Sequence, residues 1–570
     1  MTTDDDRLAA LTRADGPFPL VERTIGGVQL QVFDREPRTL RDAFLATADL
    51  GDRDAVVYRD ERWTYDEQWS TVVALAHALR DDLGVAQGDR VAIAMRNYPE
   101  WIFTFWALQL LGAVVVPLNA WLRAGELGEL LADARPSVVV ADAERLALLR
   151  ELDTAALGVR HLVAVRCPDV PDAVVPYEAL LARLGDDLAP PECEISPDDP
   201  ATILFTSGTT GRPKGALGTH RNHSASLLNK IIRSVPVPER FDPDGPPLRP
   251  APSARLVTFP FFHIAGINNL YTLAYSGHRM VLMHKWDAQE AARLVEAEGI
   301  TDLAGPPFVI QTFLDAVEAG TRDVSSLKRL GMGGSSAPLH LIARVHATFE
   351  GRVAPSTGYG LTETTSGVVA IGGQEWIARP DSVGRPLPTV EVRILDEAGR
   401  ALPVGEVGEI AIRGPQVITH YEHGESPDSF VDGWFRTGDQ GRLDEEGYLS
   451  LSGRLKDVVI RGGENINAAE VEDCLSSHPA VLEVAVFGLP HESLGEELAA
   501  VVRLGAGTTI GPEDLQAYVA ERLAAFKVPA RIAVVGQSLP RTASGKIVKR
   551  DIVDVMDLRG ALAAPAPATR

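Results

Sequence analysis

The sequence predicts an α/β fold in which a large layered N-terminal domain precedes a small α+β C-terminal domain. At 570 residues the chain is too long for one hydrophobic core. Between about residues 70 and 370, short β-branched runs alternate with helical patterns, as in layered domains with largely parallel sheets. From about residue 380, short strands are joined by Gly and Asp turns, and residues 457–556 mix helices with strands.

Eight runs in the first part are typical of strands buried on both faces, because they are short and almost wholly apolar. They are RVAIAM (90–95), GAVVVPLN (112–119), PSVVVAD (136–142), HLVAVRC (161–167), ATILFTS (201–207), RLVTFPFF (255–262), RMVLMH (279–284) and KRLGMGG (328–334). The proline-rich residues 236–253 can form neither a helix nor a central strand, so we expect an exposed loop there.

One hydrophobic stretch, WIFTFWALQLLGAVVVPL at residues 101–118, is nearly long enough to span a bilayer. Gln109, Gly112 and Pro117 interrupt it, and it follows a strand-like run. We therefore expect a buried helix followed by a buried strand, and no integral membrane segment.

Composition and charge narrow the classes of function. The formal net charge of −23 argues against nucleic acid or an anionic membrane as the main partner. Cys167, Cys193 and Cys474 lie far apart and form neither a disulfide framework nor a metal motif. The acidic first residues lack the pattern of a signal peptide, so we expect a cytoplasmic protein.

The stretch FTSGTTGRPKG, from Phe205 to Gly215, is dense in glycines, hydroxyls and positive charge. Glycines permit positive φ and close approach of the backbone to a ligand, and successive N–H groups form an anion-binding concavity. Lys214 adds a mobile point charge suited to phosphate. The spacing differs from that of the Walker loop. We interpret the stretch as a phosphate-binding loop between a strand and the helical segment at residues 219–232.

Six further motifs follow this loop, and each of them is weak alone. They are GGSSAP (333–338), STGYGLTE (356–363), RTGD (436–439), GRLKD (453–457), RGGENI (461–466) and LPRTASGKIVKR (539–550). Together and in this order they resemble the adenylate-forming (AMP-binding) superfamily, in its acyl-CoA synthetase branch. The resemblance covers roughly residues 40–555.

Members of that superfamily use ATP and Mg²⁺ to convert a carboxylic acid into an acyl-adenylate, and acyl-CoA synthetases then transfer the acyl group to coenzyme A. The resemblance implies an N-terminal AMP-binding domain at residues 30–455, with two sheets packed with helices and a small β-barrel-like part. It also implies a mobile C-terminal domain at residues 456–558, which turns about a hinge at Lys456. Other members often have Asp at this position. We expect residues 559–570 to be a disordered tail.

The resemblance also implies a role for each residue that matches a family motif. Lys546 matches the adenylation lysine, Thr362 a hydroxyl that contacts the α-phosphate, and Glu363 the magnesium carboxylate. His263 matches an aromatic residue beside the substrate carboxylate. The implied phosphate-loop residues are Thr206, Ser207, Gly208, Thr209, Thr210 and Lys214.

The implied adenine and ribose contacts are Ser335, Gly358, Tyr359, Gly360, Asp439 and Arg454. The usual form near Ser335 is closer to Gly-Gly-Ala-Pro, which leaves the adenine contacts there open. Gly462 and Gly463 would line the path of coenzyme A. The acyl pocket is expected around Gly266, Ile267, Gly305, Gly334 and residues 365–368, with Asn268, Asn269 and Val369 nearby.

The function expected from this resemblance is an acid–CoA ligase that acts on a fatty or other acyl acid. The runner-up is an adenylating enzyme that loads a carrier protein. An amino-acid activator is disfavoured because FFHIAG contains no aspartate for an α-ammonium, and a luciferase-like oxygenase would need an unusual substrate. The acid could be aliphatic, aryl or polycyclic, and a homodimer is left open.

Overall fold

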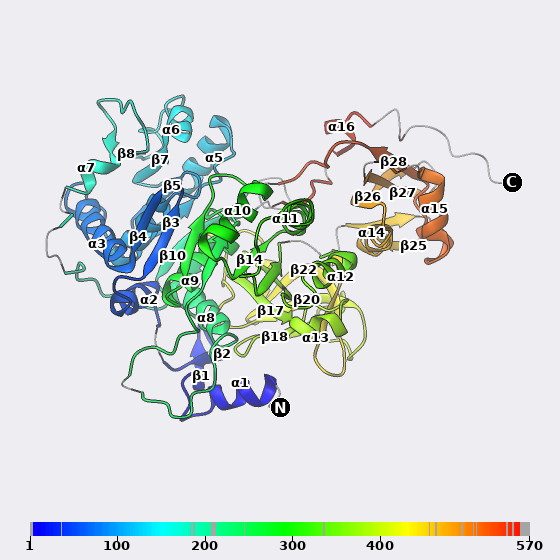
Figure 1. Ribbon diagram of the computed structural model, residues 1–570, viewed down its shortest axis with the longest axis horizontal. Coiled ribbons are helices and arrows are strands. Elements are labelled where there is room, and N and C mark those ends of the chain that lie inside the picture. Colours follow the sequence, from blue (N-terminus) through cyan, green and yellow to red (C-terminus); the bar gives the residue numbers. More distant parts are fainter. Residues whose placement is uncertain are drawn as a thin grey trace.

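The computed structural model describes residues 4–558 and Leu562, except residues 36, 183, 186–188, 207–212, 244, 335–336, 455–456, 462–463, 492–493, 506, 509, 543–544 and 550–551. Two large sheets, two five-stranded sheets, one two-stranded sheet and their helices make up this part of the chain (Figure 1). The α/β fold class with a large N-terminal domain and a C-terminal domain is thereby confirmed. The domain boundaries given above stay predictions.

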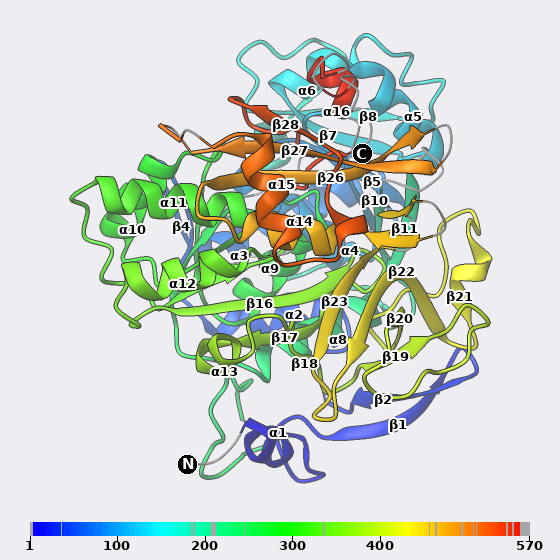
Figure 2. The same ribbon diagram turned by 90° about the vertical axis from the view of Figure 1, so that its right-hand side faces the viewer.

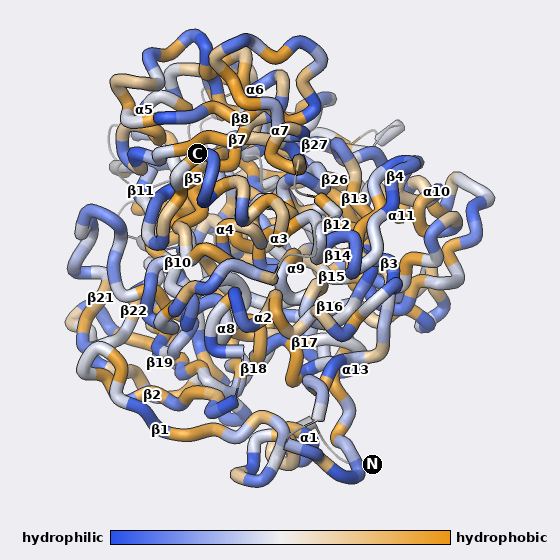
Figure 3. Tube along the Cα trace, turned by 90° about the vertical axis from the view of Figure 1, so that its left-hand side faces the viewer, coloured by the Kyte–Doolittle hydropathy of each residue, from blue (hydrophilic) through white to orange (hydrophobic). Residues whose placement is uncertain are grey.

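The first large sheet has seven strands in the order β11-β10-β6-β5-β7-β8-β9 and is parallel apart from its β10–β11 edge. Its strands are β5 (Arg90–Ala94), β6 (Val114–Pro117), β7 (Val138–Asp142), β8 (His161–Val165), β9 (Val175–Pro176), β10 (Pro200–Thr206) and β11 (Lys214–Thr219). One face packs on α3 (Tyr65–Asp81) and α4 (Pro99–Leu111), and the other on α5 (Ala124–Ala134) and α6 (Ala143–Leu149). Because both faces are covered, these strands are almost continuously hydrophobic (Figure 3).

The second large sheet has nine strands in the order β18-β17-β16-β15-β14-β12-β13-β3-β4. They are β3 (Asp54–Tyr58), β4 (Glu61–Thr64), β12 (Ala254–Val257), β13 (Arg279–Leu282), β14 (Asp302–Gly305), β15 (Arg329–Met332), β16 (Ala354–Leu361), β17 (Ser366–Gly372) and β18 (Arg385–Pro386). One face packs on α10 (Ala288–Glu298), α11 (Pro307–Ala319), α12 (Leu339–Thr348) and α13 (Gly373–Ala378). The other face packs on α2 (Leu40–Leu45), α8 (His220–Ile231) and α9 (Ile264–Tyr275), which share a core with α3 and α4.

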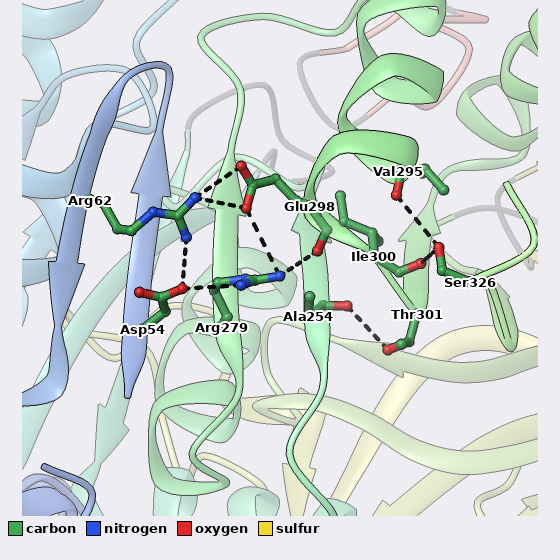
Figure 4. A network of polar contacts seen from close by, with 9 residues as sticks. All are labelled: Asp54, Arg62, Ala254, Arg279, Val295, Glu298, Ile300, Thr301 and Ser326. Atoms are coloured by element: carbon green, nitrogen blue, oxygen red, sulfur yellow. Dashed lines mark hydrogen bonds and ion pairs between the residues drawn. The ribbon is translucent and has the colours of Figure 1, made fainter. Parts of the chain in front are cut away.

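An ion-pair network joins one end of this sheet to α10 (Figure 4). Arg62 of β4 donates to Asp54 of β3 at 2.7 Å and to the Glu298 carboxylate at 3.0 Å. Arg279 of β13 pairs with the same Asp54 at 3.0 Å and donates to the Glu298 carbonyl. The network fixes the ends at which β3 and β13 begin.

The remaining N-terminal elements are short or peripheral. They are α1 (Asp4–Thr12), β1 (Leu20–Ile25), β2 (Val28–Phe33), η1 (Ala46–Asp49) and α7 (Tyr177–Leu180). An antiparallel five-stranded sheet then follows, with β19 (Glu391–Leu395), β20 (Gly408–Arg413), η2 (Pro427–Ser429), β21 (Phe430–Val431), β22 (Trp434–Leu443) and β23 (Leu449–Arg454).

The C-terminal elements form a separate layer with their own cores, at the right of Figure 1 and facing the viewer in Figure 2. They are β24 (Val458–Arg461), β25 (Glu464–Asn467), α14 (Ala468–Ser476), β26 (Val481–His491), β27 (Gly495–Leu504), α15 (Pro512–Ala520), η4 (Ala525–Lys527), β28 (Arg531–Val535) and α16 (Ile552–Val555). This layer contacts the N-terminal part where the Ser476 carbonyl lies 3.0 Å from Nδ1 of His340.

All eight strand-like runs contain strands, and residues 101–118 form a buried helix followed by a buried strand, as predicted. No helix in the described part of the chain is long and apolar enough to span a membrane. One expectation was wrong. The phosphate-loop motif does not lead directly into a helix, because β11 pairs antiparallel with β10 and only then continues into α8.

Candidate active site

A cavity of about 1120 Å³ lies where the two large sheets, the five-stranded sheet and the C-terminal layer meet. Its wall is built from segments far apart in the sequence. The predicted site residues on it are Thr206, Lys214, His263, Gly358, Tyr359, Gly360, Thr362, Glu363, Asp439, Arg454 and Lys546. Ser207, Gly208, Thr209, Thr210, Ser335, Gly462 and Gly463 lie outside the described residues.

Thr206 and Lys214 stand at the two ends of the predicted phosphate loop. Thr206 ends β10, Lys214 begins β11, and the two residues are register partners in the hairpin. The Lys214 ammonium donates to Oγ of Ser426 at 2.5 Å and lies 5.3 Å from the centre of the Tyr421 ring. The hairpin therefore holds a lysine at the cavity wall, at the root of the loop.

Thr362 and Glu363 lie on the turn between β16 and β17. Oγ1 of Thr364 accepts a hydrogen bond from the Leu361 N–H at 2.8 Å, and Gln416 donates to the Thr364 carbonyl at 2.9 Å. Thr365 and Ser366 adopt φ values of 48° and 86°, which residues other than glycine rarely do. Such strain persists only where surrounding contacts enforce it, and it concentrates at functional sites.

Glu363 accepts a hydrogen bond on Oε1 from the Tyr421 hydroxyl at 2.7 Å, and its carboxylate remains on the cavity wall. Among the described residues, no group of three or more His, Cys, Asp or Glu side chains could hold a metal ion. Mg²⁺ is commonly held by one or two carboxylates together with substrate phosphates and water. A single glutamate beside the hairpin that carries the predicted phosphate loop fits that mode of binding.

Tyr359, Asp439 and Arg454 form one hydrogen-bonded group. The Tyr359 hydroxyl donates to Oδ2 of Asp439 at 2.7 Å, and Nε of Arg454 pairs with Oδ1 at 2.8 Å. Burial and the Asp439 charge raise the pKa of Tyr359 well above its usual value, so its hydroxyl stays a donor. The tyrosine also packs in the core beneath the five-stranded sheet, so its ring is rigid. Each Asp439 oxygen keeps a lone pair for a further donor.

The two glycines that flank Tyr359 leave room for the strand pairing beneath the cavity. A Cβ on Gly360 would lie 2.0 Å from the Ser366 carbonyl oxygen, and one on Gly358 would lie 2.6 Å from that of Val369. These glycines therefore serve the close approach of β16 to β17, in addition to any ligand contact.

His263 immediately precedes α9, and its imidazole is buried at the cavity wall. Its Nε2 atom has no hydrogen-bond partner among the described residues. Burial, and secondarily the charge of Lys546, lower the pKa of His263 to about 4. The ring is therefore neutral near pH 7 and has an unsatisfied polar atom beside the cavity.

Lys546 comes from the C-terminal layer, on a hairpin closed by the bridge between Arg541 and Ile547. The Arg541 guanidinium lies 5.3 Å from the Phe308 ring at the start of α11. Gly545 has φ +85°, and a Cβ there would lie 2.6 Å from the Phe308 ring and 3.0 Å from Pro306. This tight contact holds the hairpin against the N-terminal part and brings Lys546 to the cavity.

Sequence reasoning missed Tyr421 and Ser426, which no motif marks. The residues expected around the acyl pocket fall into two groups. Gly334, Ser366, Gly367, Asn269 and Val369 do line the cavity. Ile267, Asn268 and Val368 are fully buried and are not among the residues that line the described cavity wall.

The arrangement surrounds one space with Lys214, Lys546, a carboxylate that could hold a metal, and a carboxylate that could accept ribose hydroxyls. Such a set of charges suits the binding of a nucleoside triphosphate next to a second anion, because their mutual repulsion must be offset by positive charge.

Comparisons with known proteins agree with this geometry. The family model of the AMP-binding enzyme matches residues 45–422, and that of the AMP-binding enzyme C-terminal domain matches residues 470–546. The chain is 35% identical to the indoleacetate–CoA ligase of Aromatoleum aromaticum, over 87% of this chain and 94% of that protein. It is 34% identical to the feruloyl-CoA synthase of an Amycolatopsis species, over 86% of this chain and 93% of that protein.

Among solved structures, the fold is similar to the o-succinylbenzoate CoA synthetase of Bacillus subtilis in complex with its acyl-adenylate intermediate. The TM-score is 0.74 at 29% identity, over 90% of this chain and 97% of that one.

Proposed function

The chain belongs to the AMP-binding enzyme family, and we propose that it is an ATP-dependent ligase that joins a carboxylic acid to coenzyme A, releasing AMP and pyrophosphate. The observation that carries the proposal is that Lys546, Glu363 and Asp439 line a single cavity although they lie far apart in the sequence. The names of the CoA ligases to which the chain is similar support the same reaction class. We also propose a cytoplasmic location, where ATP and coenzyme A are available.

In the proposed first step, a carboxylate oxygen of the acid attacks the α-phosphorus of ATP, and pyrophosphate leaves. Lys214 and Lys546 would offset the repulsion between the anionic reactants, and Thr362 would donate to the α-phosphate. Tyr359 and Asp439 would hold the adenine ring and the ribose. Mg²⁺, when bound at Glu363, would neutralise charge on the phosphates.

In the proposed second step, the thiolate sulfur of coenzyme A attacks the acyl carbon, and AMP leaves. The thiol proton passes to solvent. Gly462 and Gly463 would line the thiol path, where a side chain would obstruct it. We propose that Lys546 at the cavity wall represents the arrangement for the first step, and that the C-terminal domain turns about Lys456 before the second.

We propose a ring-bearing or otherwise polar-substituted acid in preference to a plain fatty acid. The wall beyond His263 contains Asn269, Thr272 and Ser276 beside the apolar Leu273. A bare hydrocarbon chain would bury these polar groups without partners, which costs free energy. Indoleacetate and ferulate, named in the two relatives, support a ring.

The deciding experiment incubates the purified chain with ATP, Mg²⁺, coenzyme A and a panel of aryl, polycyclic and aliphatic acids. Pyrophosphate release reports the first step, and mass spectrometry of acyl-CoA reports the second. An AMP-forming thioester product would support the proposal. Free acyl-adenylate that is never transferred to coenzyme A, but is transferred to the phosphopantetheine of a carrier protein, would overturn it in favour of carrier loading.

A further inference from the structure

One section of the cavity wall carries polar and positively charged side chains. They come from the end of α8 and the residues after it, from α9 and its C-terminal turn, and from β12. The residues are Lys230, Arg233, Ser234, Arg255, Asn269, Thr272, Ser276 and His278. We call this set the distal arm.

The distal arm contains three basic side chains, Lys230, Arg233 and Arg255, and no carboxylate. The acidic residues on the described wall are Glu363, Glu409, Asp428 and Asp439, which lie on or beside the five-stranded sheet and the turn after β16. A carboxylate behind the wall, Asp302, lies 3.4 Å from Arg255. The same carboxylate accepts from Nε of Arg329 at 2.5 Å, so one negative charge serves two guanidinium groups.

Among the basic residues of the distal arm, Lys230 is the one whose positive charge is least balanced by a negative partner. Its ammonium makes no hydrogen bond or ion pair with the part of the chain that the structure describes. Burial, and secondarily the charge of Arg255, lower the pKa of Lys230 to about 8, so it is still mostly protonated at pH 7. A partly buried cation that faces a cavity without a counter-ion is costly to maintain, and proteins normally pair such a charge.

Two further polar groups on the same wall support this interpretation. Nε of Arg255 and Oγ1 of Thr272 are both buried without a hydrogen-bond partner among the described residues. Together with Lys230 they place three hydrogen-bond donors without an acceptor on the same wall: an ammonium, a guanidinium N–H and a hydroxyl. An anionic group with several lone pairs would supply the hydrogen-bond acceptors that this wall lacks.

The position of the arm relative to the reacting end follows from α8. Ser226 of this helix donates to the Thr365 carbonyl at 2.7 Å, next to the turn that carries Thr362 and Glu363. Lys230 lies four residues further along, which is about 6 Å of helix. Arg233 donates to the Ala370 carbonyl at 3.3 Å, at the far end of β17. The basic groups therefore lie roughly one helical turn or more beyond the reacting end.

We propose that the acid activated by this enzyme carries a second anionic group, a carboxylate, at the end opposite the reacting carboxylate, and that Lys230 and Arg255 bind it. The inference rests on the proposed function, because it concerns the acyl substrate of that same site. Lys230 is a specificity-determining residue, whereas the adenylation machinery on the other side of the cavity acts on either kind of acid.

The test compares two diacids with their own monoesters, so that only the distal charge changes. The pairs are 3-(4-carboxyphenyl)propanoic acid with its ring methyl ester, and suberic acid with monomethyl suberate. For each compound, kcat/KM for pyrophosphate release is measured, and the shift in melting temperature reports binding even without turnover. The variants are Lys230→Met, which keeps most of the length, and Lys230→Arg, which keeps the charge. Lys328→Met, at an exposed lysine, is the matched control.

We expect the wild type to favour a diacid over its ester by about ten- to hundredfold, the range for one hydrogen bond to a charged group. Lys230→Met should abolish this preference by lowering kcat/KM for the diacids, whereas Lys230→Arg and Lys328→Met should retain it. Equal use or equal binding of diacid and ester by the wild type would overturn the inference, as would a preference that survives in Lys230→Met. In either case, formation of acyl-CoA from the monoester would show that the proposed ligase function is correct and that only the inference about the second carboxylate fails.

Discussion

The Tyr421 hydroxyl donates a hydrogen bond of 2.7 Å to Oε1 of Glu363, the residue proposed to hold magnesium. The face of the same ring lies 5.3 Å from the Lys214 ammonium, at the root of the hairpin formed by β10 and β11. Burial, and secondarily the Glu363 charge, raise the pKa of Tyr421, so its hydroxyl remains a donor throughout the working pH range. One tyrosine thus orients both the carboxylate and the lysine.

Replacing Tyr421 with Phe removes the hydrogen bond and keeps the ring over Lys214. We expect kcat/KM to fall about tenfold, since hydrogen bonds to charged groups contribute about 1.5–3 kcal/mol. The Mg²⁺ concentration for half-maximal rate should rise, because the carboxylate loses its orientation. A magnesium titration of pyrophosphate release measures both effects.

The control is Tyr448→Phe, because the Tyr448 hydroxyl donates to Glu375 at 2.5 Å in the same kind of pair but away from the cavity wall. This variant should keep the wild-type magnesium dependence. An identical shift in both variants would mean that the effect comes from lost stability and not from Glu363.

Lys546→Ala should separate the two half-reactions. The lysine is proposed to stabilise charge that develops in the first step, and loss of such a contact in a closed site costs about 3–4 kcal/mol. Formation of acyl-adenylate should fall about 10²- to 10³-fold, while pre-made acyl-adenylate and coenzyme A should still give thioester at the wild-type rate. Single-turnover assays of each half-reaction measure this.

Lys527→Ala is the control for that experiment, since it removes a lysine of the C-terminal layer that pairs with Glu470 on its surface. It should leave both steps intact. Equal losses in the two half-reactions of Lys546→Ala would contradict the proposed role of the lysine.

The sequence predicted best what depends on local pattern. Runs such as Val138–Asp142 are apolar at every position but the last, because both faces of the sheet are covered, and this pattern marks them as strands. Lys214–Thr219 was not predicted as a strand, because KGALGT has two glycines and no β-branched residue before its last position. Its strand conformation comes from pairing with β10, a tertiary contact.

The residues of the site likewise include some that the sequence predicts and some that only the fold shows. Glu363, Asp439 and Lys546 stand in motifs whose order identifies them, and they lie on one cavity wall. Tyr421 has no such motif, and its importance depends on its distance to Glu363. Lys230 falls inside a predicted helix, and only the fold shows that it lines the cavity and that its ammonium has no partner among the described residues.

Gly545→Ala should weaken adenylation without touching a charged group. The glycine has φ +85°, and a Cβ would approach the Phe308 ring to 2.6 Å, so the hairpin must move away from α11. Because Lys546 is the next residue, we expect the first half-reaction to slow by at least tenfold, with thioester formation from pre-made adenylate preserved. Gly536→Ala is the control, because no atom lies within 4 Å of its added Cβ. If Gly545→Ala left adenylation at the wild-type rate, the hairpin contact would not position Lys546.

Buried histidines should make the fold sensitive to mild acid. Burial lowers the pKa of His223 to about 3, and its Nε2 lies 2.9 Å from Oγ1 of Thr202 in the core beneath the cavity. In the unfolded chain the same group titrates near 6.5, so below that pH the unfolded state binds a proton that the folded state excludes. The contribution is fully present above pH 6.5 and is lost as the pH falls towards 3, at up to about 1.4 kcal/mol per pH unit.

We therefore expect the free energy of unfolding to decrease steadily between pH 6.5 and 5, and this decrease to be shallower in His223→Gln, whose side chain does not titrate. His420→Gln, at an exposed histidine, should keep the wild-type slope. Urea unfolding at half-unit pH intervals measures the slope independently of any loss of absolute stability in the variant. Parallel curves for wild type and His223→Gln would mean that the pKa of His223 is nearly the same in the folded and unfolded chains, and so that its site is more polar than the hydrogen bond to Thr202 and the surrounding burial imply.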